Sequence, residues 1–315
     1  FGQRGCNAQA GMPMYGSMRS NGDLQAFDFQ GKMPFTARTP RKPLNLIALI
    51  TCFCLPLLIF VVVFAAQTFT LHYESPRVCM LLCSILLAFV LLLGYFAYSA
   101  VVQKTAGVQE PEWYAFVFAT GALSWVFAFA LGQVNFEVNM QPFYDVSNLN
   151  VYQSVNPAKV PGQQVMDAGR IMFTPDSHLD VTKAMGFQNQ ERYCVAPVTA
   201  GPTGPNATRL ERYDFWAVGL DCCAGHGADY RCGDPDNPKI TSGLRLMREE
   251  ERPYYRLAVK QAEAAHNIRA THPVFLYWVE NPTAELFTFQ DDGFKYFLLG
   301  CFSFSSLQLF AIVIA

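Results

Sequence analysis

The residues with the clearest chemistry are four cysteines in one polar stretch of the chain: Cys194, Cys222, Cys223 and Cys232. The other six of the ten cysteines lie in long apolar runs or near the N-terminus. An even number of cysteines in an oxidising compartment predicts disulfides. A bridge between adjacent cysteines needs a strained ring, which leaves two pairings. These are Cys194–Cys222 with Cys223–Cys232, or Cys194–Cys223 with Cys222–Cys232.

Zinc is the competing interpretation of the same stretch. Cys222, Cys223, His226 and Cys232 offer four ligands within eleven residues, and tetrahedral Cys₃His sites exist. The spacing matches no standard zinc knuckle, so we expect disulfides rather than a metal.

Two further groups of side chains have types that bind metals, and we expect both to be solvated turns. The two groups are Asp176, His178 and Asp180, and Asp229, Asp234 and Asp236.

Catalytic motifs are absent from the sequence. It contains no G-x-S-x-G, no H-E-x-x-H and no Walker loop. His226, His266 and His272 are isolated histidines, which are usually surface or packing residues. We therefore expect no cofactor and no enzymatic activity.

The elements that position these residues include four long apolar runs, at 44–69, 78–102, 113–131 and 294–315. A helix needs about 20 apolar residues to cross the hydrocarbon core of a membrane. The runs contain no charged residue except Lys295 at the edge of the fourth, although ion paths normally require such residues. This pattern predicts four membrane spans and disfavours a pump, channel or transporter.

A stripe of small side chains follows one face of the third run: Thr120, Ser124, Ala128 and Gly132. Small residues at this spacing let a second helix approach closely. The stripe predicts packing within the bundle of this chain, with a partner subunit as the alternative.

Charge decides the expected orientation. Residues 1–43 carry six Lys and Arg against two Asp and Glu, and Arg38, Arg41 and Lys42 directly precede the first run. Positive residues beside a span favour the cytosolic side, so residues 1–43 are expected in the cytosol and 133–293 outside it. The sequon at Asn206 predicts glycosylation on that outer side. The protein is thus expected in the plasma membrane or an endomembrane.

The segment 133–293 has the texture of a folded α+β ectodomain. Strands are expected at 164–166, 170–173, 193–198 and 213–218, and a helix at 244–270 with Pro253 in its first turn. On the strand around 213–220, Tyr213 and Phe215 alternate with Asp214 and Trp216, and both faces are largely apolar. We expect an interior strand with Trp216 buried.

The predicted fold is therefore a four-helix transmembrane bundle with a disulfide-containing α+β ectodomain between spans three and four. The expected boundaries are 1–43 for the tail, 44–132 for spans one to three, 133–293 for the ectodomain and 294–315 for span four. The net charge of −2 and the absence of a basic domain argue against nucleic acid as a partner.

Two resemblances add to this interpretation. Four spans with a large third loop that contains a Cys-Cys pair resemble tetraspanins, although Ala224 replaces the glycine that follows the pair in that family. The strings VPGQQVMDAGRIMF, YCVAPV, YDFWAVGLDCC and GLRLMREEERPYYRLAVKQAEAAH resemble a family of multi-pass membrane proteins abundant in dinoflagellates. The second resemblance covers nearly all of 159–282 and implies an architecture without an assigned activity.

These observations favour a structural or interaction protein that belongs to a larger membrane complex. Its expected partners are membrane lipids, other membrane or lumenal proteins, and a glycan. The alternative is a receptor for a small molecule or a lipid, and a transporter accessory or an enzyme is less favoured.

Overall fold

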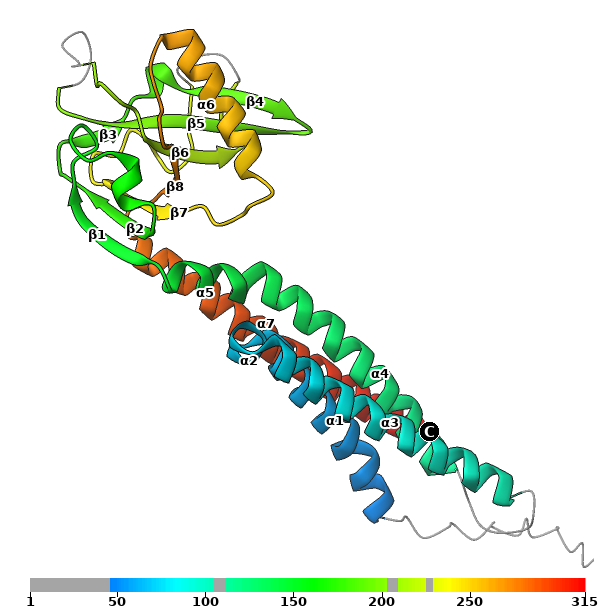
Figure 1. The fold of residues 1–315 in the computed structure, drawn as a ribbon. Helices are drawn as coiled ribbons and strands as arrows, with labels where there is room; N and C mark the ends of the chain where they lie inside the picture. The colour runs from blue at the N-terminus through cyan, green and yellow to red at the C-terminus, as the bar shows by residue number, and fades with distance from the viewer. Residues whose placement is uncertain (1–45, 105–111, 203–208, 225–228, 315) are drawn as a thin grey trace, which may run out of the picture. The chain divides into compact units, whose positions relative to one another are not determined.

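The structure is a computed structural model that describes residues 46–104, 112–202, 209–224 and 229–314. Four of its helices are long and apolar enough to cross a membrane, as the sequence predicts. They are α1 (Leu46–Thr68), α3 (Pro76–Lys104), α4 (Glu112–Asn135) and α7 (Pro282–Ile314). The chain is therefore indicated to be a membrane protein with a folded region between its third and fourth long helices (Figure 1).

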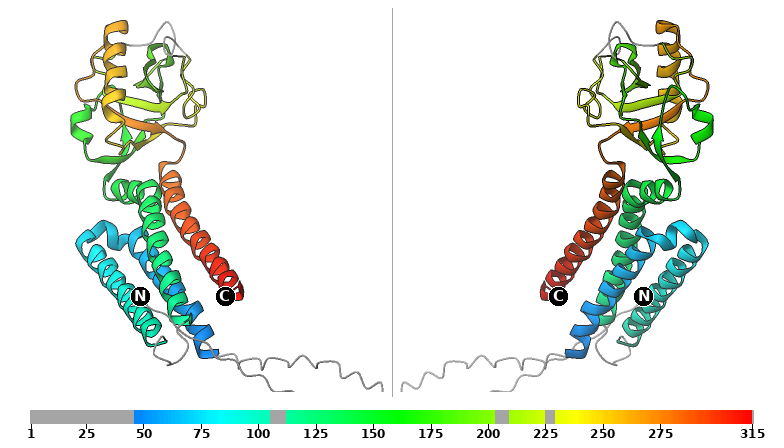
Figure 2. Two further views of the ribbon diagram at one scale, coloured as in Figure 1. Left: turned by 90° about the vertical axis from the view of Figure 1, so that its right-hand side faces the viewer. Right: turned by 90° about the vertical axis from the view of Figure 1, so that its left-hand side faces the viewer.

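The four helices pack around a shared apolar core. Figure 2 shows α1 and α4 crossing, with α3 on one side and α7 on the other. The rings of Phe60 on α1 and Phe304 on α7 stack at 4.3 Å between centroids. Many outward side chains on α3 and α7 are large, apolar and exposed, as expected for helices surrounded by lipid.

The small-residue stripe of α4 faces α1 of the same chain. Ser124 and Ala128 are fully buried, and Thr120 is half-buried. A Cβ atom on Gly132 would press on Gln67 and would lie 3.4 Å from the ring of Phe64 on α1. In this structure the stripe thus packs against α1 of the same chain.

Two of the long helices extend well beyond their apolar runs. A π-helical turn, η1 (Phe136–Met140), and α5 (Gln141–Ser147) continue α4, while α7 begins at Pro282 and has 33 residues. At 1.5 Å per residue α7 is about 50 Å long, against a hydrocarbon core of about 30 Å. Run length predicts how much helix lies in lipid, but it does not predict where the helix ends. The helices therefore pass the expected boundaries at 132 and 293.

Polar contacts join α4 to α7 where both leave their apolar runs. The amide of Asn135 donates to the Gly293 carbonyl oxygen at 2.8 Å, and the amide of Asn139 donates to Asn135 Oδ1 at 2.8 Å. Gly293 permits this approach, because a Cβ there would lie 3.1 Å from Met140 Cγ. The short helix α2 (Thr70–Glu74) also joins this region, since Tyr73 donates to Asp145 on α5.

The folded region contains an eight-stranded mixed sheet with the order β1-β2-β7-β8-β6-β5-β3, in which β4 also pairs with β5. The strands are β1 (Asn150–Val155), β2 (Ala168–Phe173), β3 (Ser177–Leu179), β4 (Met185–Asn189), β5 (Glu191–Ala200), β6 (Phe215–Leu220), β7 (Ser242–Arg245) and β8 (Val274–Trp278). The pairs β1–β2 and β6–β8 are parallel, and the others are antiparallel.

Each face of the sheet has its own apolar core. The helix α6 (Arg252–His266) lies across one face and packs Tyr255, Ala258 and Val259 around Trp216 (Figure 1). The opposite face carries Phe215 and Ala217 with the cysteine cluster. Because both faces are covered, β6 is apolar along most of its length, as a strand buried on both sides must be.

Several sequence predictions for this region need correction. Residues 164 and 165 belong to the 3₁₀ helix η2 (Gly162–Val165), and Met166 to the turn after it, rather than to a strand. The helix expected from 244 begins only at Arg252, because 242–245 pair as β7 and Pro253 fixes the first turn. Tyr213 packs with Trp216 rather than with Phe215, since the strand starts at Phe215 and alternation does not reach Tyr213.

Candidate functional site

The cysteine cluster forms two disulfides beside β5 and β6. Cys194 pairs with Cys223 and Cys222 pairs with Cys232, with Cα–Cα distances of 5.9 and 5.5 Å. This is the second of the two pairings that the sequence left open. It excludes these three neighbouring cysteines as thiolate zinc ligands, and His226 lies outside the described residues.

Gly219 on β6 makes room for this cluster. It lies opposite Cys194 in the sheet register. A Cβ atom there would meet Cys232 Sγ, and it would lie 2.8 Å from Cys232 Cβ and 3.0 Å from Cys222 Sγ. The disulfides therefore pack directly on the sheet and have a structural role.

We expect peptide mapping by mass spectrometry without reduction to recover Cys194 linked to Cys223 and Cys222 linked to Cys232. Trypsin does not cut between Cys222 and Cys223, so a second protease is needed to assign the partners of the adjacent pair. Recovery of Cys194 linked to Cys222, or of four free thiols, would contradict this pairing.

Neither of the other two candidate metal groups assembles. The imidazole of His178 contacts the Asp176 carbonyl oxygen and the Thr199 hydroxyl, while Asp180 forms an ion pair with Lys183. Asp229 accepts a hydrogen bond from the Ala224 amide. Across the described ranges, no group of three or more His, Cys, Asp or Glu side chains has metal-binding geometry.

Asp214 is a buried carboxylate whose role the sequence does not reveal. It is 3% exposed and accepts three backbone N–H bonds, from Gly162 at 3.0 Å, Thr271 at 2.9 Å and His272 at 3.2 Å. A carboxylate has lone pairs for several such donors. Asp214 thereby joins the segment before β6 to η2 and to the segment before β8.

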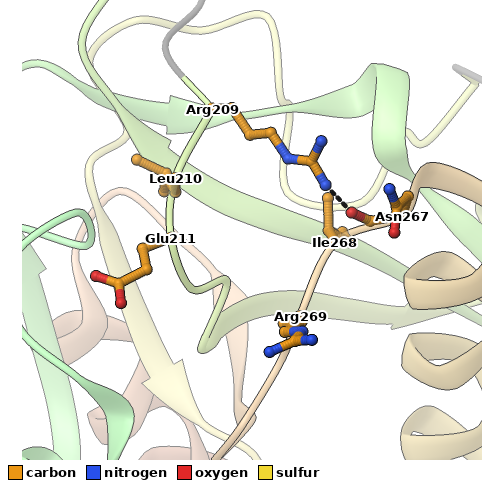
Figure 3. Close-up of a pocket in the computed structure, with 6 residues that line it drawn as sticks. All are labelled: Arg209, Leu210, Glu211, Asn267, Ile268 and Arg269. Carbon is orange, nitrogen blue, oxygen red and sulfur yellow. Dashed lines mark hydrogen bonds between the residues drawn. The ribbon is translucent and has the colours of Figure 1, made fainter.

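Residues before β6 and before β8 also line a cleft of about 500 Å³ (Figure 3). Its lining residues come from two stretches, Arg209, Leu210 and Glu211 on one side and Asn267, Ile268 and Arg269 on the other. The amide of Tyr213 donates to the Arg269 carbonyl oxygen at 2.8 Å and holds the two stretches together.

The cleft is lined by exposed charged side chains, two of them cationic and one anionic, and by two more deeply placed aliphatic side chains. Ile268 is buried and Leu210 is half-buried, whereas Arg209, Arg269 and Glu211 are exposed. In Figure 3 the Arg209 guanidinium reaches to the Asn267 carbonyl oxygen, and Glu211 points away from this pair. Each guanidinium has five N–H donors, so both arginines retain donors for an incoming carboxylate or sulfate.

Asn267 ends α6 in the left-handed conformation, with a φ of 51°. Its backbone N–H donates to the Glu263 carbonyl oxygen. Asparagine tolerates this conformation better than most residues. After this turn, residues 267–269 line the cleft. The chain then continues through β8 to α7.

A group of polar side chains around Glu251 lies near the start of α6. Its members are Arg248, Glu251, Tyr255 and Tyr277. Burial and nearby Glu251 raise the pKa of Tyr277 to about 12, and the same two causes raise the pKa of Tyr255 further. The hydrogen bond to Glu251 raises the pKa of the Arg248 guanidinium. The raised pKa values disfavour the tyrosinate forms, so neither hydroxyl is suited to act as a general base.

The sequence gives no direct signal for the cleft. Arg209 and Arg269 are 60 positions apart and follow no motif, and only the fold brings them together. The glycosylation candidate Asn206 lies outside the described residues. No family, curated protein or solved structure matches this chain.

Proposed function

We propose that this protein is a non-enzymatic interaction subunit of a membrane assembly and that its ectodomain docks a partner protein at the arginine cleft. The observation that carries the proposal is that two exposed arginines, Arg209 and Arg269, line one cleft together with the aliphatic side chains of Leu210 and Ile268. Arginine is enriched at protein interfaces because it pairs with carboxylates through two parallel bonds and stays charged.

The way the sheet is attached to the helices supports this role. Val146 on α5, Leu244 on β7 and Leu286 on α7 form one buried cluster, and Arg170 on β2 donates to Thr283 on α7. A binding site on a firmly attached scaffold loses less entropy when a partner docks than one on a loose tether.

The lining of the cleft favours one kind of partner. It contains two cations, two aliphatic side chains, the amide of Asn267 and the carboxylate of Glu211, which points away from Arg209 (Figure 3). Sites for small apolar ligands and lipids are instead mostly apolar. A loop that presents Asp or Glu beside an apolar residue fits the cations and the aliphatic side chains. A sulfated or carboxylated glycan would use the cations alone, and the test below separates the two.

The proposed orientation places the sheet domain on the non-cytoplasmic side of the plasma membrane or an endomembrane. Arg38, Arg41 and Lys42 before α1 support a cytosolic N-terminal region. The two disulfides support an oxidising environment for the sheet domain.

We expect the full-length protein in detergent to bind an Asp- and Glu-rich peptide with an aliphatic residue in biolayer interferometry. The combined Arg209→Ala and Arg269→Ala substitutions should weaken this binding at least about tenfold, because they remove both cations of the cleft. A tenfold loss of affinity corresponds to about 1.4 kcal/mol of binding free energy. The matched control is Arg256→Ala, which removes an exposed arginine from α6 and should change little.

Sulfated glycosaminoglycan and neutral dextran serve as comparison probes. Tighter binding of the glycosaminoglycan, lost in the same double variant, would make a glycan the partner in place of a protein. Equal effects of the double variant and of Arg256→Ala would show general charge attraction and would reject the cleft as the docking site.

A further inference from the structure

Glu211 is the anionic side chain among the residues that line the arginine cleft, and it is exposed. In the part of the chain that the structure describes, its carboxylate has no hydrogen bond and no ion pair, although Arg209 stands two positions before it. Figure 3 shows Glu211 directed away from Arg209 and Asn267. A wholly acidic partner would gain from the arginines but would be repelled by this carboxylate.

The main chain beside Glu211 is anchored by Tyr213, which is buried. The Tyr213 hydroxyl accepts a hydrogen bond from the Leu210 N–H at 3.2 Å. The Tyr213 N–H in turn donates to the Arg269 carbonyl oxygen at 2.8 Å. Glu211 therefore lies between two anchored residues, and its backbone keeps a defined place in the cleft. A charge that is positioned before binding loses less entropy when a partner arrives.

The opposite charges of the cleft are close enough for one short segment to reach both. Arg209 and Glu211 are two residues apart, so their Cα atoms are at most about 7 Å apart. Side chains on one face of an extended strand repeat about every 7 Å, and those three or four residues apart on a helix are about 5–6 Å apart. An acidic and a basic residue two to four positions apart can thus reach both charges together.

The charge of the surrounding domain also favours a partner of mixed charge. Residues 133–293 carry fourteen Lys and Arg against twenty Asp and Glu, which gives a net charge of −6. Like charges that are brought together at an interface cost free energy, so an entirely acidic segment is repelled everywhere except at the two arginines. A basic residue opposite Glu211 removes part of this repulsion and pairs with a free carboxylate.

We propose that Glu211 determines which segment docks at the arginine cleft. The docking segment carries a Lys or Arg for Glu211 together with the Asp or Glu that binds Arg209 and Arg269. This inference rests on the docking function proposed for the cleft. The arginines attract every acidic segment, whereas Glu211 discriminates among them, because an acid in place of the base would bring two carboxylates together.

The test compares two synthetic peptides in biolayer interferometry with the full-length protein in detergent. One peptide contains Asp, an aliphatic residue and Lys, and the other is identical except that Glu replaces the Lys. We expect the parent protein to bind the Lys peptide at least about threefold more tightly, the scale of an exposed ion pair. Glu211→Gln should abolish this preference, and Glu211→Lys should reverse it.

The matched control is Glu250→Lys, which makes the same change of charge at an exposed glutamate before α6. The 15 residues of α6 place this position about 20 Å from the cleft, so the preference should remain. No preference in the parent protein, or equal reversal by Glu211→Lys and Glu250→Lys, would overturn the role of Glu211.

The Arg209→Ala and Arg269→Ala double variant distinguishes this failure from a failure of the docking site. If that variant weakens both peptides while the parent shows no preference, the cleft docks a partner and only the selectivity of Glu211 is rejected. If the double variant weakens neither peptide, both the docking site and the inference about Glu211 are rejected.

Discussion

Replacing Trp216 with alanine should lower the free energy of unfolding by about 3–5 kcal/mol, the usual loss for a large buried aromatic side chain. Trp216 is 0% exposed and lies under α6 with Tyr255 and Val259. Its indole Nε1 donates to the Tyr213 carbonyl oxygen at 2.7 Å. The substitution therefore creates a cavity and removes a buried donor that holds the start of β6 in place.

The measurement is thermal unfolding of the full-length protein in detergent, followed by near-ultraviolet circular dichroism. Trp216→Phe is the matched control, because it fills most of the cavity and loses only the N–H donor, so it should be clearly less destabilising. A domain of ordinary stability has about 5–15 kcal/mol in total, and the alanine variant should accumulate poorly in cells. An unchanged melting temperature together with lost peptide binding would instead make Trp216 an interface anchor.

The parts of the fold that the sequence predicts well are those with a local cause. Four apolar runs predict four helices, because a membrane requires a minimum apolar length. Pro253 is expected in a first helical turn and lies there in α6, since its fixed φ and missing N–H suit this position, although the helical pattern places the start too early, at 244. Apolar residues on both faces of 215–220 predict an interior strand, and β6 lies between β8 and β5.

The parts that the sequence does not predict depend on distant partners. The short strand β7 and the strand β8 are recognisable only through their pairing with each other and with β2 and β6. The helical extensions into η1, α5 and the start of α7 are stabilised by contacts such as Asn135 with Gly293, which lie 158 residues apart.

The same distinction applies to the candidate sites. The disulfide cysteines are predictable because their chemistry and compartment restrict them to few pairings. The arginine cleft and the Asp214 contacts assemble from segments near 162, 209–214 and 267–272. No local pattern connects these segments, so only the folded chain reveals that they meet.

Substitutions at Asp214 should show how much these contacts contribute. Asp214→Ala removes the acceptor of three backbone N–H groups, of which that of Gly162 is in a buried setting. A buried donor left unsatisfied costs about 1–3 kcal/mol. We therefore expect Asp214→Ala to lower the free energy of unfolding by about 2–4 kcal/mol, since the donors of Thr271 and His272 are partly reached by water.

Asp214→Asn separates the two sides of this carboxylate. Its single amide oxygen can still accept from Thr271 and His272, but its NH₂ group then faces the Gly162 N–H, and two donors cannot pair. The asparagine variant should thus lose only the Gly162 contact and have an intermediate melting temperature in the same unfolding assay.

Asp214→Asn should also keep residues 267–272, which include the cleft residues 267–269, in place. Acidic-peptide binding should therefore survive in Asp214→Asn and decline in Asp214→Ala. If both variants unfold at the same temperature, the negative charge rather than the individual hydrogen bonds holds these segments together, and the arrangement argued for Asp214 is wrong.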